Sequence, residues 1–233
     1  MTLARVLADP PRVHAWQPGQ LTSSGLPREC FEYISSHIDA TSHTLETGAG
    51  ISTVVFALKQ AQHICVAPDR AEVDRLKAYC DAAGIPTSSI QFHLVRSDQF
   101  FQRWQPQPLD LVLIDGCHGF PAPFIDWFYT AASIRLGGML VIDDTNLWTG
   151  AVLKEFLAAE PEWRLDGPRS PKTAVFRKVA DYVPWKEWTR QPYVSDRSRL
   201  PRPRWSRARH ALSLARTGRY GVLLKKAMKY LRG

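Results

Sequence analysis

The chain has 233 residues, of which 45% are hydrophobic and 22% are charged, and its formal net charge is +8. This composition is that of a globular protein and excludes a disordered, collagen-like or coiled-coil chain. The charge is unevenly divided, because residues 197–233 contain twelve Lys and Arg and no Asp or Glu, whereas residues 1–196 contain eighteen basic and twenty-two acidic residues. Length and charge together predict one mid-sized, mildly acidic domain with a basic appendage.

The expected compartment is the cytoplasm. No apolar run approaches the roughly 18 residues that span a bilayer, and the first residues contain Asp9 and two prolines where a signal peptide has its apolar stretch. The four cysteines include no C-x-x-C pair, so we expect reduced thiols and neither a zinc site nor a disulfide framework.

Helical patterns and short apolar runs alternate after an irregular lead-in, which is expected over residues 1–26 because it is rich in Pro, Ser and Gly. A helix is expected after Pro27, where Phe31, Ile34 and Ile38 recur at helical spacing. Strands are then expected over 43–47, 63–68, 91–95, 110–115, 137–143, 162–166 and 173–179, and helices over 51–60, 69–83, 121–135 and 148–159.

This alternation predicts an α/β fold with a Rossmann-like, doubly wound, mostly parallel sheet. The last two strands are close in sequence, so the final strand is expected to be antiparallel. The domain should span residues 27–180, because the sequence then becomes rich in Pro, Trp and Arg. A linker over 181–204 and a basic amphipathic helical tail over 205–233 complete the predicted organisation.

The first strand–helix junction contains a glycine loop, Glu46-Thr47-Gly48-Ala49-Gly50-Ile51-Ser52-Thr53. Glycines allow a sharp turn and close approach to a ligand at a helix N-terminus. A dinucleotide fingerprint would have its third glycine at position 53, and a carboxylate at Glu46 would repel a pyrophosphate. The loop therefore favours a cationic ligand, or it only closes the strand onto its helix.

This E-x-G-x-G-x-S-T pattern resembles the first motif of class I S-adenosylmethionine-dependent methyltransferases. The resemblance implies that the cofactor is bound by Glu46, Gly48, Gly50, Ser52 and Thr53. Such enzymes hold the cofactor ribose with an acidic residue at the end of the second strand, where this chain has Ala67. Asp69 either reaches back to the ribose or caps the next helix, and Ser97 and Asp98 either contact the adenine or cap a short helix.

Three carboxylates end two neighbouring predicted strands: Asp115 ends one strand, and Asp143 and Asp144 end the next. The carboxyl ends of neighbouring parallel strands face one crevice, so these side chains should converge. Clustered carboxylates repel one another unless a cation lies among them, and oxygen ligands suit Mg²⁺ or another hard divalent ion. The sequence therefore predicts a metal site, the alternative being that these residues cap helices and hold loops.

The 28-residue separation of Asp115 and Asp143, with the Asp-Asp pair, resembles the metal-dependent O-methyltransferases of the catechol type and of antibiotic sugar pathways. The resemblance covers roughly residues 40–180. It implies that His118 removes the proton of a substrate hydroxyl, a role that suits an imidazole near pH 7. Alternatively, His118 hydrogen-bonds a carboxylate and shapes the loop.

The tail over 205–233 has helical patterns with apolar side chains on one side and basic side chains on the other, including Lys225, Lys226, Lys229 and Arg232. Such a pattern is typical of a helix on an anionic membrane surface. The alternatives are packing on the body or a partner subunit, and nucleic-acid binding, which is disfavoured because the tail contains no recognised motif.

These features favour an S-adenosylmethionine-dependent O-methyltransferase, assisted by a divalent cation and acting on a hydroxyl of a small molecule or glycan. Two alternatives stay open. One is a non-catalytic or metal-independent protein of this fold that is tethered by its tail, and the other is a nucleic-acid methyltransferase that grips its substrate with the tail.

Overall fold

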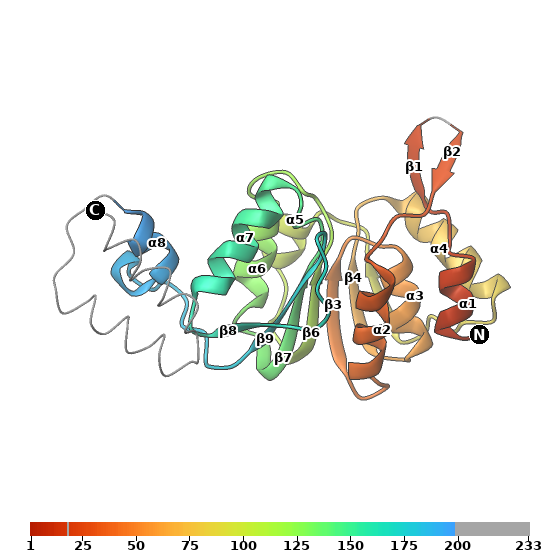
Figure 1. Cartoon of the computed structure of the whole chain (residues 1–233). Helices are drawn as coiled ribbons and strands as arrows, with labels where there is room; N and C mark the ends of the chain where they lie inside the picture. The colour runs from red at the N-terminus through yellow and green to blue at the C-terminus, as the bar shows by residue number, and fades with distance from the viewer. Residues whose placement is uncertain (18, 199–233) are drawn as a thin grey trace.

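The structure, a computed structural model, describes residues 1–17 and 19–198 and has one seven-stranded sheet and one hairpin (Figure 1). The strands are β1 (His14–Gln17), β2 (Gln20–Thr22), β3 (His43–Thr47), β4 (Gln62–Val66), β5 (Ile90–His93), β6 (Leu109–Ile114), β7 (Ile134–Ile142), β8 (Trp163–Asp166) and β9 (Ala174–Lys178). The helices are α1 (Leu3–Ala8), α2 (Arg28–His37), α3 (Ile51–Leu58), α4 (Arg70–Ala82), α5 (Ser97–Phe101), α6 (Ala122–Thr130), α7 (Trp148–Ala159), the 3-10 helix η1 (Trp188–Arg190) and α8 (Pro192–Arg197).

The main sheet has the strand order β5-β4-β3-β6-β7-β9-β8. Strands β3 to β7 pair in parallel, and β9 is antiparallel to both β7 and β8. Within this sheet the chain runs from β3 outward to β5 and then crosses to β6 on the other side of β3, so a topological switch point lies between β3 and β6. The predicted doubly wound, mostly parallel sheet with an antiparallel final strand is confirmed.

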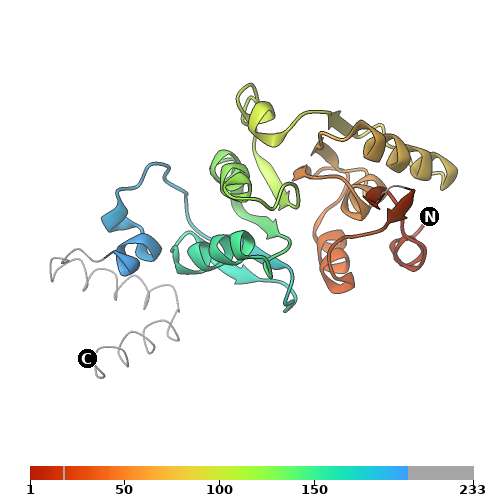
Figure 2. The same cartoon turned by 90° about the horizontal axis from the view of Figure 1, so that it is seen from above.

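Helices cover both faces of the sheet, with α1–α4 on one side and α5–α7 on the other (Figures 1 and 2). Each face buries its own apolar core. The first core includes Phe31 of α2 and Phe56 of α3, and the second includes Trp127 of α6 and Trp163 of β8. Strands covered on both faces read as nearly continuous apolar runs, as β6 does with Leu-Asp-Leu-Val-Leu-Ile.

Three local expectations differ from the structure. Residues 1–26 are not irregular: they form α1, which buries Val6, and the β1–β2 hairpin. The predicted linker contains η1 and α8, and the Tyr193 backbone N–H of α8 donates to Glu160. The helix expected over 121–135 ends at Thr130, because β7 already begins at Ile134. The predicted tail over 205–233 lies outside the described residues.

Among the residues that the structure describes, no helix is both long enough and apolar enough to cross a membrane.

The glycine loop passes between the ends of β4 and β6. The Gly48 N–H donates to the Val66 carbonyl over 2.9 Å, and the backbone φ of Gly48 is +93°. A Cβ atom at Gly48 would overlap the Asp115 carbonyl oxygen and lie 2.9 Å from its carbon. Only glycine therefore fits here, for reasons of both conformation and space.

Gly48→Ala should lower the free energy of unfolding by about 2–4 kcal/mol, because the methyl group must displace the Asp115 backbone and the residue must keep a left-handed conformation. Urea denaturation measures this change. Gly50→Ala is the matched control, because Gly50 is extended and its Cβ would first meet the His14 ring at 3.3 Å. Similar losses in both variants would contradict the role given to Gly48.

Asp126 of α6 is a buried carboxylate near Thr47 of the glycine loop. Its side chain is buried, and neither oxygen accepts a well-formed hydrogen bond within the described part of the chain. Burial raises the pKa of Asp126 to about 6, although the nearby hydroxyls of Ser97 and Thr47 lower it. The folded protein thus binds a proton at Asp126 more tightly than the unfolded chain does.

Asp126→Asn should therefore stabilise the protein in a pH-dependent way. The wild type loses stability as the pH rises from about 4 to about 6 and Asp126 ionises, at a cost of up to about 3 kcal/mol. The Asn variant should gain about 1–3 kcal/mol over the wild type at pH 7.5 and little at pH 4. Thermal melting at both pH values tests this, with the exposed Asp74→Asn as control, and an equal gain at both would contradict it.

Candidate functional site

A cavity of about 1050 Å³ opens at the carboxyl edge of the sheet, next to the switch point. Its wall brings together nine of the twelve predicted site residues: Gly48, Gly50, Ser52, Ser97, Asp98, Asp115, His118, Asp143 and Asp144. Gly48 lies against the Asp115 backbone, so the glycine loop and the carboxylates with His118 form adjoining parts of this wall. The structure thus joins the two predicted motifs in one cavity, while Glu46, Thr53 and Asp69 do not line it.

Glu46 is turned away from the cavity, contrary to the role expected from the resemblance. Its carboxylate faces α3, where the Ser52 hydroxyl donates to Oε2 over 2.7 Å and the Thr53 hydroxyl donates to Oε1. Thr53 in turn accepts the Gly50 N–H over 3.0 Å. Glu46 and Thr53 therefore stabilise the loop and the start of α3 through hydrogen bonds, and neither residue lines the cavity.

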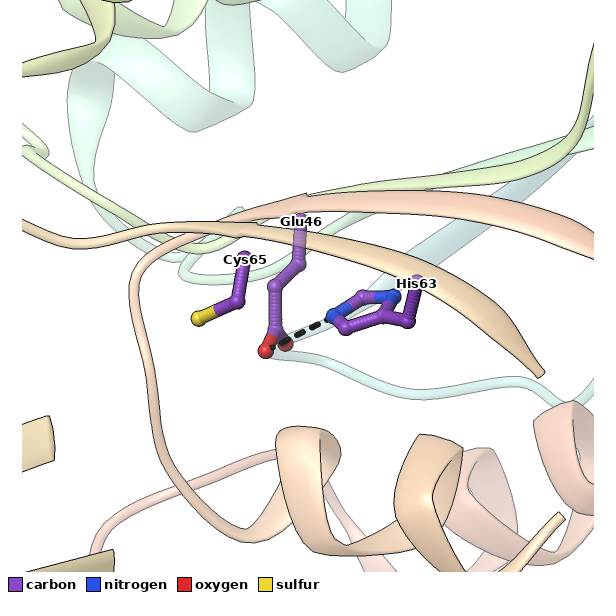
Figure 3. A group of neighbouring side chains, drawn as sticks. All are labelled: Glu46, His63 and Cys65. Carbon is purple, nitrogen blue, oxygen red and sulfur yellow. Dashed lines mark ion pairs between the residues drawn. The ribbon is translucent and has the colours of Figure 1, made fainter. Parts of the chain in front are cut away.

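Two further buried side chains complete this cluster. Figure 3 shows Glu46 between Cys65 and His63 of β4, with the His63 Nε2 atom 3.1 Å from Glu46 Oε1. The three could geometrically hold a metal ion. However, these groups already have partners: burial and then the Glu46 charge raise the pKa of the Cys65 thiol, which donates to the Gly48 carbonyl over 3.4 Å, and Glu46 accepts the hydroxyls of Ser52 and Thr53. We interpret the cluster as structural.

Asp69 is the N-cap of α4. Its Oδ1 atom accepts the backbone N–H groups of Ala71 and Glu72 over 2.8 and 3.3 Å, as N-cap residues do. Of the two roles left open by the sequence, the structure shows the cap. The carboxylate that does line the cavity near Ala67 is Glu72, whose Oε1 lies 3.1 Å from Nδ1 of His14, another cavity residue.

The carboxylates after β6 and β7 converge as predicted. Asp143 is almost fully buried, and the Thr173 hydroxyl donates to its Oδ1 over 2.5 Å. Asp144 follows with a left-handed φ of 50°, a conformation that costs energy outside glycine and is often found at functional sites. This turn points Asp144 toward His118, whose Nε2 lies 3.1 Å from Asp144 Oδ2.

A lysine that the sequence analysis did not single out lies among these carboxylates. The Nζ atom of Lys172 is 3.0 Å from Asp143 Oδ2 and 3.4 Å from Asp144 Oδ1. Burial and then the charge of Asp143 raise the pKa of Asp115 well above its usual value, and Lys172 opposes this rise. The acidic group therefore already contains one cation that belongs to the chain.

The expected metal ligands do not fit together as predicted. Each oxygen of Asp143 and Asp144 already lies at a partner: Thr173, Lys172 or His118. The set whose donor atoms lie within 4.8 Å of one another is Asp115, His118 and Asp144, without Asp143. A divalent ion on this set would engage His118 and approach the Lys172 ammonium, so the predicted Asp115, Asp143 and Asp144 site does not describe this geometry.

The sequence analysis did not single out the cavity residues His14, Glu72 and Lys172. Glu72 lies in the first turn of α4, close to the expected ribose position, which is a signal that could have been used. Lys172 directly precedes the antiparallel β9, whose start must lie at the carboxyl edge beside Asp143. His14 comes from the hairpin, for which the sequence contained no comparable signal.

Comparison with known proteins agrees with this geometry. Residues 45–145 match a family described as a methyltransferase domain, and no curated protein matches the chain. Among solved structures, the chain is similar to the O-methyltransferase TomG from Streptomyces achromogenes, determined with S-adenosylmethionine, at 15% identity and a TM-score of 0.53, covering 67% of this chain and 82% of that one.

Two further solved structures share the fold. Cofactor-bound Rv0187 from MTB is 15% identical with a TM-score of 0.56, covering 76% of this chain and 88% of that one. An rRNA methylase from Streptococcus thermophilus is 13% identical with a TM-score of 0.51, covering 67% and 100%. Together with the glycine loop and the strand order, the match over residues 45–145 indicates a methyltransferase domain, and these solved structures share its fold.

Proposed function

We propose that the chain is an O-methyltransferase that transfers the methyl group of S-adenosylmethionine to a hydroxyl of a small molecule or glycan. The observation that carries this proposal is the single cavity that joins the glycine loop to His118 and the carboxylates. The glycine loop fits a cofactor at the start of α3, and the carboxylates with His118 fit a substrate hydroxyl beside a base. When bound, S-adenosylmethionine supplies a sulfonium methyl, whose bond to sulfur breaks as the bond to the hydroxyl oxygen forms.

His118 is the proposed base. Its side chain is 42% exposed and lies in the cavity wall, with Nε2 next to Asp144. A proton on Nε2, directed at the Asp144 carboxylate, leaves Nδ1 free to accept the hydroxyl proton. Asp144 then stabilises the imidazolium that forms, while the cavity orients the acceptor oxygen toward the methyl group.

An aromatic rim beside His118 supports an acceptor with a ring. Phe120 lines the cavity and is 70% exposed, and its ring centroid lies 6.4 Å from that of the equally exposed Trp148. Leu147 extends this apolar surface. Flat apolar rims stack on aromatic rings and on sugar faces, which is consistent with the acceptor classes inferred from the sequence.

Metal assistance is not a step of this proposal, because the predicted ligands are partly engaged by Lys172, Thr173 and His118. Attachment to an anionic membrane through residues 205–233 stays a prediction from the sequence. Nucleic-acid methylation remains the disfavoured alternative.

The cofactor ribose is assigned to Glu72 in this proposal. Glu72 is the carboxylate that faces the cavity from α4, and His14 holds it at 3.1 Å. Asp69, which the sequence offered for this role, already accepts two backbone N–H groups as a helix cap. Glu72 thereby compensates for Ala67 at the end of β4.

Glu72→Gln should weaken S-adenosylhomocysteine binding about tenfold, because a charged acceptor for the ribose hydroxyls is lost. Asp69→Asn is the matched control: it should lower the melting temperature by weakening the cap, but change the affinity by less than about twofold. Isothermal titration calorimetry measures both affinities. The reverse pattern, with Asp69→Asn losing affinity, would assign the ribose to Asp69.

His118→Ala should lower kcat by about 10²–10⁴-fold, as the loss of a general base does, while S-adenosylhomocysteine affinity stays near the wild-type value. The assay follows transfer of a labelled methyl group from S-adenosylmethionine to a panel of hydroxyl-bearing aromatic compounds and sugars. His37→Ala, on α2 away from the cavity, is the control. An unchanged kcat would remove the base from the mechanism, and wild-type protein without cofactor affinity would favour the non-catalytic alternative.

A further inference from the structure

Lys172 lies where a cation is needed. Its Nζ atom bridges Asp143 and Asp144 at 3.0 and 3.4 Å. Asp144 in turn contacts His118, and Asp143 accepts the Thr173 hydroxyl. The result is a continuous chain of polar contacts from the start of β9 to the proposed base.

The backbone around Lys172 is fixed. Its carbonyl accepts both the backbone N–H and the hydroxyl of Thr145, over 2.6 and 2.9 Å. Its own N–H and that of Thr173 donate to the Ser170 hydroxyl, each over 3.1 Å. The pairing of Ala174 with Ile142 then holds this segment beside the end of β7. Lys172 is therefore attached to the same strand end that carries its carboxylate partners.

Lys172 also contacts the segment before α2. Its Nζ donates to the Gly25 carbonyl over 3.0 Å, and Ser24 and Gly25 line the same cavity as the carboxylates. One ammonium thus connects the segment before α2 with the end of β7. Its loss would release both sides of this part of the wall.

The charge state of Lys172 is that of a cation. Its Nζ atom lies at three acceptor oxygens, those of Asp143, Asp144 and the Gly25 carbonyl, and a protonated amine has three N–H donors to match them. A divalent ion binds carboxylate oxygens at about 2.0–2.6 Å. On Asp143 or Asp144 it would lie close to the ammonium, and the two cations would repel each other.

We propose that Lys172 is the resident cation of this carboxylate group, taking the place of a divalent metal, and that it positions Asp144 for its contact with His118. This inference deepens the proposed function and rests on it. Lys172 acts through Asp143 and Asp144, so it is a positioning residue. It follows that methyl transfer needs no added metal. It also follows that removal of the lysine charge allows a divalent ion to bind to the carboxylates.

The test is Mn²⁺ binding by the full chain, first freed of metal with a chelator and followed by calorimetry and electron paramagnetic resonance. Wild type and Lys172→Arg should bind Mn²⁺ no more tightly than about 1 mM, because each keeps a cation among the carboxylates. Lys172→Gln and Lys172→Met should bind Mn²⁺ at least about tenfold more tightly. Lys154→Met, on α7, is the control for removal of a lysine elsewhere.

Three results would overturn the proposal: tight Mn²⁺ binding by the wild type, no gain in either neutral variant, or the same gain in Lys154→Met. Melting temperature and S-adenosylhomocysteine affinity establish that each variant is folded, and Lys172→Gln keeps a donor for the Gly25 carbonyl should Lys172→Met not fold. A wild type that fails to bind S-adenosylhomocysteine would overturn the proposed function, while the Mn²⁺ series would still report on Lys172. Wild-type methyl transfer that requires Mg²⁺ after chelation would overturn the inference alone.

Discussion

The parallel pairing of β6 with β7 brings three carboxylates together at the carboxyl edge of the sheet. Strand ends that pair in register must finish at the same edge, so Asp115 after β6 meets Asp143 and Asp144 after β7. The repulsion within such a group is relieved by positive charge among the carboxylates or by protonation of one of them. The antiparallel β9 supplies this positive charge. It begins at the same edge of the sheet, so Lys172 and Thr173, which directly precede it, lie beside the carboxylates.

The conformation of the glycine loop depends on a different buried carboxylate, that of Glu46. Glu46 gathers the hydroxyls of Ser52 and Thr53 beneath the glycine loop, and Thr53 holds the Gly50 N–H. The loop can then keep Gly48 in a conformation that other residues rarely adopt. The acidic residue of the motif therefore acts through the backbone of the loop, and the loop residues that line the cavity include Gly48, Gly50 and Ser52.

Much of the fold could be predicted from the sequence, because covered parallel strands and their helices have distinct periodicities. The order of the site residues along the chain also predicted their convergence. The direction of Glu46 was missed, although strand alternation places it on the same face as Thr44, toward α3. The prediction of an antiparallel final strand also placed Lys172 near the carboxyl edge of the sheet. Only the register of Ala174 with Ile142 shows which carboxylates Lys172 contacts.

A lysine and a divalent metal are not equivalent solutions to the same electrostatic problem. A metal can bind the acceptor oxygen directly and lower the pKa of its hydroxyl. The Lys172 ammonium already directs its N–H donors at two carboxylates and the Gly25 carbonyl, so it has no donor left for a substrate. In the mechanism that we propose, the proton is then taken by a side chain that faces the cavity. His118 meets that need: it is exposed to the cavity, and it is fixed through Asp144 to the same lysine that neutralises the group. The proposed mechanism thus divides charge compensation and proton removal between two residues that share one carboxylate.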